Sequence, residues 1–509
     1  MNYLDWISKW SSYTPDKKAV RSLDTGRIYT YKQLDDTSRK IGNFLLNRFQ
    51  LKKGDRIAVV AKHSPEYLML FIAAQRLGII LVPLNFRATS YELKHCITDV
   101  IPTLVLAEGS SFELLEEELK SYSSASLTLF LSFFTEAEKL DLPEVLNKFT
   151  IEVDQPIFIF YTSGTTGKPK GVIYTNRMMF WNSLNTSVQL EITSADHTLN
   201  VLPPFHTSGW NVLLLPMLHR GARVDFLKRF KPKRVLNYIE EEPISLFLAV
   251  PTMLRMMVKN KAFSTFKADV LKYIVVGGEP LSIKLIDAWA EKGIFLSQGY
   301  GLTEAGPCIT SLHHHDALWK KGSIGKPNFY VDMKIVNTSG EEVANYEYGE
   351  ICLKGNIVTP GYWNNSSYSF NKIKEEWLYT GDIAKIDEDG FIYIVGRKNQ
   401  LFISGGENIH PSEIEQVLYK NNLVKEAAVI GIEDENWGEI GVAFIVLNDD
   451  DDLKADDILN HLKKYLASYK IPKDIICLDS LPKSGIGKID RVKLKDLYKI
   501  INHEKRNVV

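Results

Sequence analysis

Short apolar runs alternate with stretches of helical periodicity over much of the chain. The strand-like runs are "RIAVVA", "IILVPL", "PTLVLA" and "IFIFYT", followed later by "ISLFLAVP", "LKYIVVGG" and "IFLSQGYG". Between them, "SPEYLMLFIAAQRLG" has apolar residues at helical spacing and ends in glycine, a frequent helix terminator. This alternation predicts an α/β fold of doubly wound sheets whose faces are covered by helices.

The pattern changes after residue 320 and again near residue 400. "VDMKIVN", "GEICLKG" and "GFIYIVG" are short strands separated by turn sequences, which predicts a small barrel-like unit. Beyond residue 400, "PSEIEQVLYK", "EAAVIGI", "VAFIVLN" and "ADDILNHLKKYLAS" predict a compact α+β segment. Because "GFIYIVG" ends at Gly396 before the charged "RKNQ", we expect an N-terminal domain over 1–396, a hinge at 397–400 and a C-terminal domain over 401–509.

Composition narrows the class of protein. A chain of 509 residues is too long for one ordinary core, which agrees with several domains. The 61 Lys and Arg residues balance 62 Asp and Glu, whereas dedicated nucleic-acid binders have a strongly basic domain. We therefore expect small-molecule chemistry and no nucleic-acid partner.

The four cysteines are far apart and form no C-x-x-C pair, so neither a structural zinc site nor a disulfide framework is expected: Cys96, Cys308, Cys352 and Cys477. The first residues, "MNYLDWISKW", lack the apolar core of a signal peptide. The most lipid-like run, "LTLFLSFF", is too short to span a bilayer and is interpreted as a buried strand. These features predict a cytoplasmic protein without a transmembrane segment, and do not decide between a monomer and a homodimer.

The stretch "YTSGTTGKPKGV" at 161–172 is the first candidate for ligand chemistry. Its glycines, Gly164 and Gly167, are too close together for a P-loop, and Pro169 stands where a P-loop has its magnesium-binding hydroxyl. With a strand on either side, it is expected to form a strand–loop–strand element. Such a loop can wrap a polyphosphate with hydroxyls, backbone N–H groups and lysines, or be a surface turn that binds nothing. The candidate residues are Thr162, Ser163, Gly164, Thr165, Thr166, Gly167, Lys168 and Lys170.

Three consecutive histidines at 313–315 invite a metal interpretation. Consecutive residues in an extended loop point in different directions and cannot all face one ion. We therefore interpret the run as a polar patch.

Six further stretches accompany the opening loop, in this order: "PPFHTSGW", "VVGGEP", "QGYGLTEAG", "YTGD", "GRKNQLFISGGENIHPSEIE" and "LPKSGIGKIDR". In order and spacing the seven resemble the motifs of the adenylate-forming superfamily, which includes acyl-CoA synthetases, peptide-synthetase adenylation domains and beetle luciferases. The resemblance extends over nearly the whole chain. It implies a large N-terminal domain, a small mobile C-terminal domain, and activation of a carboxylic acid by ATP and Mg²⁺.

The resemblance also implies roles for individual residues. The opening loop would hold the β- and γ-phosphates, Tyr300 would stack on adenine, Thr303 would contact the α-phosphate and Glu304 would bind Mg²⁺. Gly277, Gly278 and Glu279 would separate adenine from the acid.

The ribose and the reacting phosphate have candidates nearer the C-terminus. Asp382 would accept both ribose hydroxyls with support from Arg397, and Lys488 would stabilise charge developing on the carboxylate and α-phosphate. The hinge departs from the family pattern, since Asn399 and Gln400 stand where charged residues are usual.

The branch within the superfamily follows from two differences. Amino-acid adenylation domains have an aspartate where this chain has His206, and we count His206 among the catalytic residues. The second difference is that no carrier domain is expected after Lys488. Both features favour a free-standing ligase that uses coenzyme A. By resemblance, the residues that would hold coenzyme A are Arg87, Gly405, Gly406, Trp437, Tyr469 and Lys473, although Ile471 replaces a basic residue there.

The acid is the least defined reactant. Phe205, Trp210 and the run "NVLLLPML" suggest an apolar pocket, which favours a medium- or long-chain fatty acid. An aryl or dicarboxylic acid is the alternative, because Arg255 could meet a second carboxylate. From other classes, a non-catalytic nucleotide binder and a luciferase-like oxygenase are alternatives, and the intact Glu304 and Lys488 argue against the first.

Overall fold

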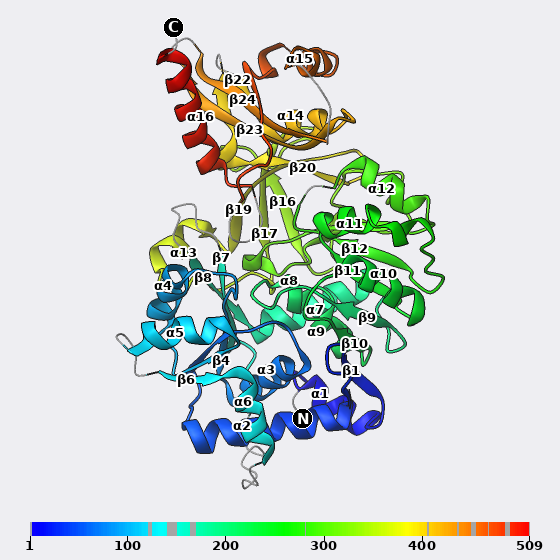
Figure 1. The fold of residues 1–509 in the computed structure, drawn as a ribbon, viewed down its shortest axis with the longest axis vertical. Coiled ribbons are helices and arrows are strands. Elements are labelled where there is room, and N and C mark those ends of the chain that lie inside the picture. The colour runs from blue at the N-terminus through cyan, green and yellow to red at the C-terminus, as the bar shows by residue number, and fades with distance from the viewer. Residues whose placement is uncertain are drawn as a thin grey trace. The chain divides into compact units, whose positions relative to one another are not determined.

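The computed structural model describes residues 3–120, 125–139, 150–162, 169–279, 281–404, 407–434, 437–448, 455–466, 468–483 and 489–507. The chain divides into two compact units (Figure 1). The first comprises Met1–Met333 and Leu353–Leu378, and the second comprises Lys334–Cys352 and Tyr379–Val509. The predicted hinge at 397–400 falls inside the second unit, and its action as a hinge stays a prediction.

The first unit contains a nine-stranded sheet of order β15-β14-β13-β12-β11-β9-β10-β1-β2. The strands from β13 to β1 in this order are parallel, while β14, β15 and β2 are antiparallel to their neighbours. Their bounds are β1 Lys18–Ser22, β2 Ile28–Thr30, β9 His197–Asn200, β10 Arg223–Phe226, β11 Leu246–Ala249, β12 Tyr273–Val276, β13 Leu296–Tyr300, β14 Thr310–Ser311 and β15 Lys326–Pro327. The helices that connect them include α7 Asn176–Gln189, α8 Ser208–Asn211, α9 Leu214–His219, α10 Pro232–Glu241, α11 Pro251–Val258 and α12 Ile283–Ala290.

A second sheet of the same unit has six strands in the order β6-β5-β3-β4-β7-β8, of which only the pair β7–β8 is antiparallel. The strands are β3 Arg56–Val60, β4 Ile80–Pro83, β5 Leu104–Ala107, β6 Ser126–Leu129, β7 Pro156–Thr162 and β8 Lys170–Thr175. The remaining helices are α1 Trp6–Tyr13, α2 Tyr31–Phe49, α3 Pro65–Leu77, α4 Ser90–Val100, α5 Ser110–Lys120 and α6 Phe130–Lys139.

Helix α3 explains why the two sheets form one unit. Every residue of α3 except Glu66 is buried, and its side chains from Tyr67 to Ala74, with Leu77, belong to a core cluster that also includes Val59 of β3 and Leu199 of β9. A helix that is apolar all round belongs in an interior, which is why "LMLFIAA" lacks a polar face. The doubly wound α/β fold predicted from the sequence is confirmed, with one local error: "LTLFLSFF" is half strand β6 and half helix α6, not one buried strand.

The middle of the chain forms the predicted barrel-like sheet, of order β16-β17-β19-β18 with β20 paired to β19. The strands are β16 Asp332–Val336, β17 Gly349–Lys354, β18 Ile373–Lys374, β19 Trp377–Ile386 and β20 Ile392–Arg397, and α13 Ser366–Lys372 precedes β18.

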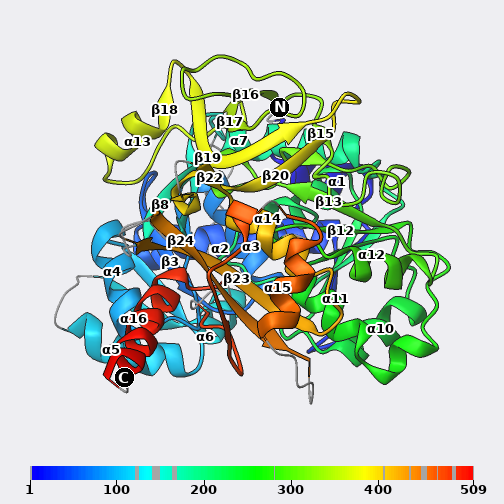
Figure 2. The ribbon, with the colours of Figure 1, turned by 90° about the horizontal axis from the view of Figure 1, so that it is seen from above.

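The C-terminal part of the second unit is the predicted α+β segment. Its sheet has the order β22-β21-β24-β23, with β25 paired to β24: β21 Phe402–Ser404, β22 Glu407–Ile409, β23 Val424–Asp434, β24 Gly438–Leu447 and β25 Asp474–Cys477. Helices α14 Pro411–Leu418 and α15 Ala455–Lys463 pack on one face and α16 Arg491–Asn507 on the other, as the two core clusters and Figure 2 show. Within the described ranges, no helix has the length and apolar character needed to cross a membrane.

Candidate functional site

The predicted phosphate loop joins two antiparallel strands, as the sequence suggested. Thr162 ends β7 and lies opposite Lys170, which begins β8. The loop residues themselves lie outside the described residues: Ser163, Gly164, Thr165, Thr166, Gly167 and Lys168. Their role in phosphate binding stays a prediction, while the strand–loop–strand element that carries them is confirmed.

Glu304 lies beside this hairpin, and both its side chain and its backbone carbonyl accept hydrogen bonds. It belongs to the short 3₁₀ helix Thr303–Ala305. The hydroxyl of Tyr362 donates to Glu304 Oε1 at 2.8 Å, and the N–H of Thr359 donates to the Glu304 carbonyl at 2.7 Å. Tyr362 also bridges to Val172 of β8. The Glu304 carboxylate is therefore fixed against the strand that follows the phosphate loop.

Aromatic rings and a cation complete this corner of the first unit. The Lys170 ammonium lies 3.4 Å from the centroid of Tyr368, whose ring meets Tyr362 edge-on at 4.7 Å. Burial lowers the pKa of Lys170, as does Lys372, whereas Glu304 acts in the opposite direction. Burial raises the pKa of Tyr362 and Glu304 raises it further, so the phenol keeps the proton that it donates.

The predicted adenine wall lies where parallel strands end. Gly277 and Gly278 follow β12, and Tyr300 ends the neighbouring strand β13. A Cβ on Gly277 would lie 3.2 Å from the carbonyl oxygen of Gly299, and Gly278 has φ +89°. Side chains are therefore disfavoured at both positions, which leaves exposed backbone at the carboxyl edge of the sheet.

Two side chains near this edge have charges of opposite sign. Glu279 Oε2 lies 3.9 Å from Nη2 of Arg255 on α11, and both side chains are partly exposed. The predicted wall residue and the candidate receptor for a second carboxylate thus lie close enough to interact.

The loop that carries His206 is anchored through a buried indole. Trp210 is fully buried, and its Nε1–H donates to the Pro204 carbonyl at 2.7 Å. Trp210 packs in the aromatic core and does not line an apolar pocket as the sequence suggested. Its role is to hold the loop that carries His206. Phe205 meets Phe86 edge-on at 5.4 Å, and the His206 ring lies 4.6 Å from that of Phe205.

The predicted ribose acceptor lies in the second unit on a strand pair. Asp382 of β19 lies directly opposite Arg397 of β20, and Arg397 Nε is 2.8 Å from Asp382 Oδ1. Asp382 is 4% exposed, and the Thr380 hydroxyl accepts from its backbone N–H at 3.1 Å. Glu350 accepts from the Gly381 N–H and from Lys398 Nζ, both at 2.9 Å. Paired strands and charged neighbours therefore fix the Asp382 carboxylate.

Two of the predicted coenzyme A residues come together in the second unit. The Lys473 ammonium lies 5.0 Å from the Trp437 ring, and Trp437 is 48% exposed just before β24. Arg87 is an exposed residue of the first unit, 5.4 Å from the Phe86 ring. The other predicted coenzyme A positions lie outside the described residues, namely Gly405, Gly406 and the side chain of Tyr469. Lys488, the predicted catalytic residue, also lies outside them.

Sequence reasoning missed Tyr362 and Tyr368. Both lie in "PGYWNNSSYS", which has no recognisable motif, and both reach the site through contacts between distant segments. The only available signal was three aromatic residues, these two and Trp363, in an otherwise polar stretch.

Comparison with known proteins agrees with these features. Residues 7–363 match the family model of AMP-binding enzymes, and residues 413–488 match the model of the AMP-binding enzyme C-terminal domain. A feruloyl-CoA synthase of an Amycolatopsis species is 33% identical over 485 residues, which cover 95% of this chain and 96% of that protein. A long-chain fatty-acid–CoA ligase of Mycobacterium tuberculosis is 31% identical over 502 residues, which cover 98% of this chain and 99% of that protein.

A solved structure is similar over the same extent. The o-succinylbenzoate CoA synthetase of Bacillus subtilis, in complex with its acyl-adenylate intermediate, has a TM-score of 0.87 at 32% identity. The match covers 96% of this chain and 98% of that one.

Proposed function

Because this chain belongs to the AMP-binding enzyme family and is an AMP-forming acyl- or aryl-CoA ligase, we propose that it activates a medium- or long-chain fatty acid. The acid carboxylate would attack the α-phosphate of ATP to give acyl-AMP and pyrophosphate. The thiol of coenzyme A would then displace AMP to give the acyl-CoA.

One observation carries the choice of acid. Phe205 and Phe86 meet edge-on beside His206, where an amino-acid ligase of this superfamily would have an acidic partner for the substrate ammonium. Apolar rings without that acid favour an alkyl or aryl chain over an amino acid. The long-chain ligase of Mycobacterium tuberculosis supports the alkyl choice.

The residues of the first unit would prepare ATP for attack. Glu304 suits Mg²⁺, since a carboxylate oxygen is the ligand that this hard cation prefers, and the Tyr362 hydroxyl orients the carboxylate. Bound Mg²⁺ would neutralise phosphate charge. Thr303 would contact the α-phosphate, and Lys170 would contribute positive charge next to the phosphate loop.

The residues of the second unit would hold the sugar and the thiol reactant. Asp382 would accept from the ribose hydroxyls, with Arg397 fixing it through their 2.8 Å contact. Trp437 and Lys473 would bind coenzyme A, the ring by stacking and the ammonium through a phosphate. Lys488 would stabilise charge during adenylation. A homodimer and a cytoplasmic location stay predictions from the sequence.

The test is a pyrophosphate-release assay across saturated acids of graded length, aromatic acids and dicarboxylic acids, each with and without coenzyme A. Each methylene buried in an apolar pocket contributes about 0.8 kcal/mol, which is about fourfold in kcat/KM until the pocket is full. For fatty acids, kcat/KM is expected to rise by this factor with each added methylene. A maximum on an aromatic acid that falls with added alkyl chain would refute the proposal.

A second candidate, a dicarboxylic acid, is favoured by Arg255. Its guanidinium lies 3.9 Å from Glu279, so it stands next to the proposed wall between adenine and acid. A dicarboxylate substrate predicts that Arg255→Met lowers kcat/KM for the diacid and spares the matched monoacid. If the substrate is a fatty acid, Arg255→Met should have the same small effect on kcat/KM for the diacid and for the monoacid.

A further inference from the structure

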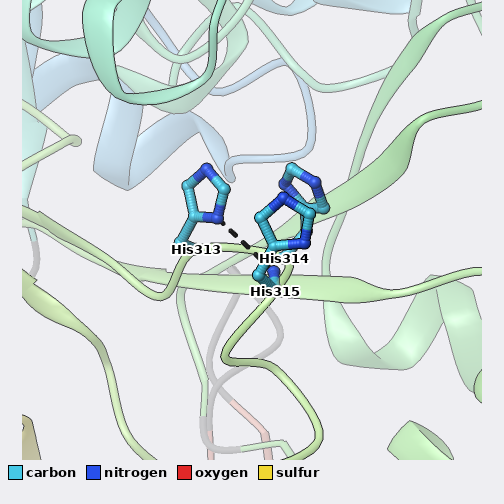
Figure 3. Close-up of side chains that lie close together, drawn as sticks. All are labelled: His313, His314 and His315. Atoms are coloured by element: carbon cyan, nitrogen blue, oxygen red, sulfur yellow. Dashed lines mark hydrogen bonds between the residues drawn. The ribbon is translucent and has the colours of Figure 1, made fainter.

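Three imidazoles gather after β14 on the first unit (Figure 3). The N–H of Asp316 donates to the His313 carbonyl at 2.9 Å, and that of Ala317 donates to the His314 carbonyl at 3.3 Å. The run is therefore a turn, and the expectation of an extended loop with diverging side chains was wrong. One ring nitrogen of each histidine lies within 4.8 Å of those of the other two.

The surroundings fix two of the rings. The His314 ring stacks on Tyr273 with centroids 4.8 Å apart and planes 11° apart, and the Tyr273 hydroxyl donates to the Leu190 carbonyl at 2.6 Å. The backbone N–H of His315 donates to His313 Nδ1 at 3.4 Å, which orients the His313 ring. A metal ion on this ring would replace that long hydrogen bond, because a neutral imidazole has only one nitrogen lone pair to offer. Glu191 Oε1 lies 3.9 Å from His313 Nε2.

We propose that His313, His314 and His315 form a binding site for a divalent transition-metal ion of the Zn²⁺ class, with Glu191 as the fourth ligand. Imidazole nitrogens suit Zn²⁺, Ni²⁺ and Cu²⁺, whereas Mg²⁺ and Ca²⁺ prefer oxygen. Zn–N bonds of about 2.0–2.1 Å in a tetrahedral site put the donor nitrogens about 3.3 Å apart. The donor nitrogens here lie up to 4.8 Å apart, so they would close by about 1.5 Å at most. Rotation of the exposed His315 side chain supplies much of this change.

This site is separate from the proposed catalytic edge. Strand β14 runs antiparallel to β13, with Thr310 opposite Tyr300, so the chain leaves the carboxyl edge before it reaches His313. Tyr273, the residue on which His314 stacks, is the first residue of β12 and lies at the amino end of that strand. Metal bound here would tie the turn to the end of helix α7 and stabilise the first unit without taking part in the chemistry.

The experiment counts Zn²⁺ bound per chain by equilibrium dialysis, with excess Mg²⁺ present to occupy carboxylate sites such as Glu304. The variants are His313→Asn/His315→Ala and, as a milder change at an exposed position, His315→Ala. A matched control is His461→Ala, which removes an imidazole from the second unit. We expect the wild type and the control to bind one more Zn²⁺ than the double variant, and Zn²⁺ to raise the Tm of only the first two.

The single variant keeps the test decisive if the double variant folds poorly, because His315 is exposed and its loss should weaken Zn²⁺ binding at least tenfold. Equal Zn²⁺ binding by the wild type and His315→Ala, with no difference in the Tm shift, would overturn the proposal.

Discussion

The proposed ribose contact gives a prediction that can be worked through in numbers. Asp382→Ala removes a carboxylate that is 4% exposed and held by Arg397 at 2.8 Å. A hydrogen bond to a charged acceptor contributes about 1.5–3 kcal/mol, so two ribose hydroxyls together contribute about 3–6 kcal/mol. At 1.4 kcal/mol for each factor of ten, kcat/KM for ATP should fall by about a hundredfold to ten-thousandfold.

The assay compares ATP with 2′-deoxy-ATP and 3′-deoxy-ATP in pyrophosphate release. In the wild type, each missing hydroxyl should cost about ten- to a hundredfold in kcat/KM, because one of the two bonds to Asp382 is lost. In Asp382→Ala the three nucleotides should react at nearly equal rates, since the shared partner is gone and the effects of the two changes do not add.

A control variant separates this specific loss from general destabilisation. Asp387 is another buried carboxylate, in the turn that joins β19 to β20, and it accepts from the N–H groups of Asp389 and Phe391 at 3.1 and 2.8 Å. Asp387→Ala should lower the Tm and leave the preference for ATP over its deoxy analogues intact. If Asp382→Ala discriminated against the deoxy analogues as strongly as the wild type does, the ribose role would be refuted.

Three further predictions separate the half-reactions. Lys488→Ala should abolish pyrophosphate release and leave thioester formation from a supplied acyl-adenylate largely intact, since its charge is needed only while the α-phosphate is attacked; equal loss of both would contradict this. Trp437→Ala or Lys473→Ala should raise KM for coenzyme A about two- to thirtyfold, the range of a cation–π or stacking contact of about 0.5–2 kcal/mol, with adenylation unchanged; a parallel fall in adenylation would count against the assignment. Asn399→Pro should keep adenylation and lose thioester formation, because proline fixes φ near −65°; normal acyl-CoA production by this variant would exclude the hinge.

The sequence predicts the parts of the fold that local pattern determines. The apolar run "IFIFYT" and the return strand "GVIYT" predict the β7–β8 hairpin, and the apolar residues of α3 predict an interior position for that helix. Junctions are harder to predict, because "LTLFLSFF" has enough apolar residues for either structure and changes from strand to helix at Phe130.

The candidate site shows more clearly that contacts between distant segments cannot be predicted from the local sequence pattern. Glycines such as Gly277 can be predicted because a close backbone approach leaves few alternatives at their positions. Tyr362 could not be predicted, since its partner Glu304 is far away in sequence and the pairing depends on how two loops meet. The histidine run was misjudged for a related reason: whether His313 and its neighbours converge depends on a turn that no residue in the run signals.

The contacts around Arg397 limit where the proposed hinge turns. Arg397 is the last residue of β20 and is bound to Asp382, and Lys398 Nζ lies 2.9 Å from Glu350 Oε2. A rotation that began before Arg397 would break this strand pairing and disturb the ribose acceptor between the two half-reactions. Hinge motions are absorbed by a few residues at the ends of elements. Within 397–400 we therefore expect the dihedral change of the proposed hinge to fall on Asn399 and Gln400. The proposed ribose acceptor would then keep hold of AMP while the thiol reactant replaces pyrophosphate.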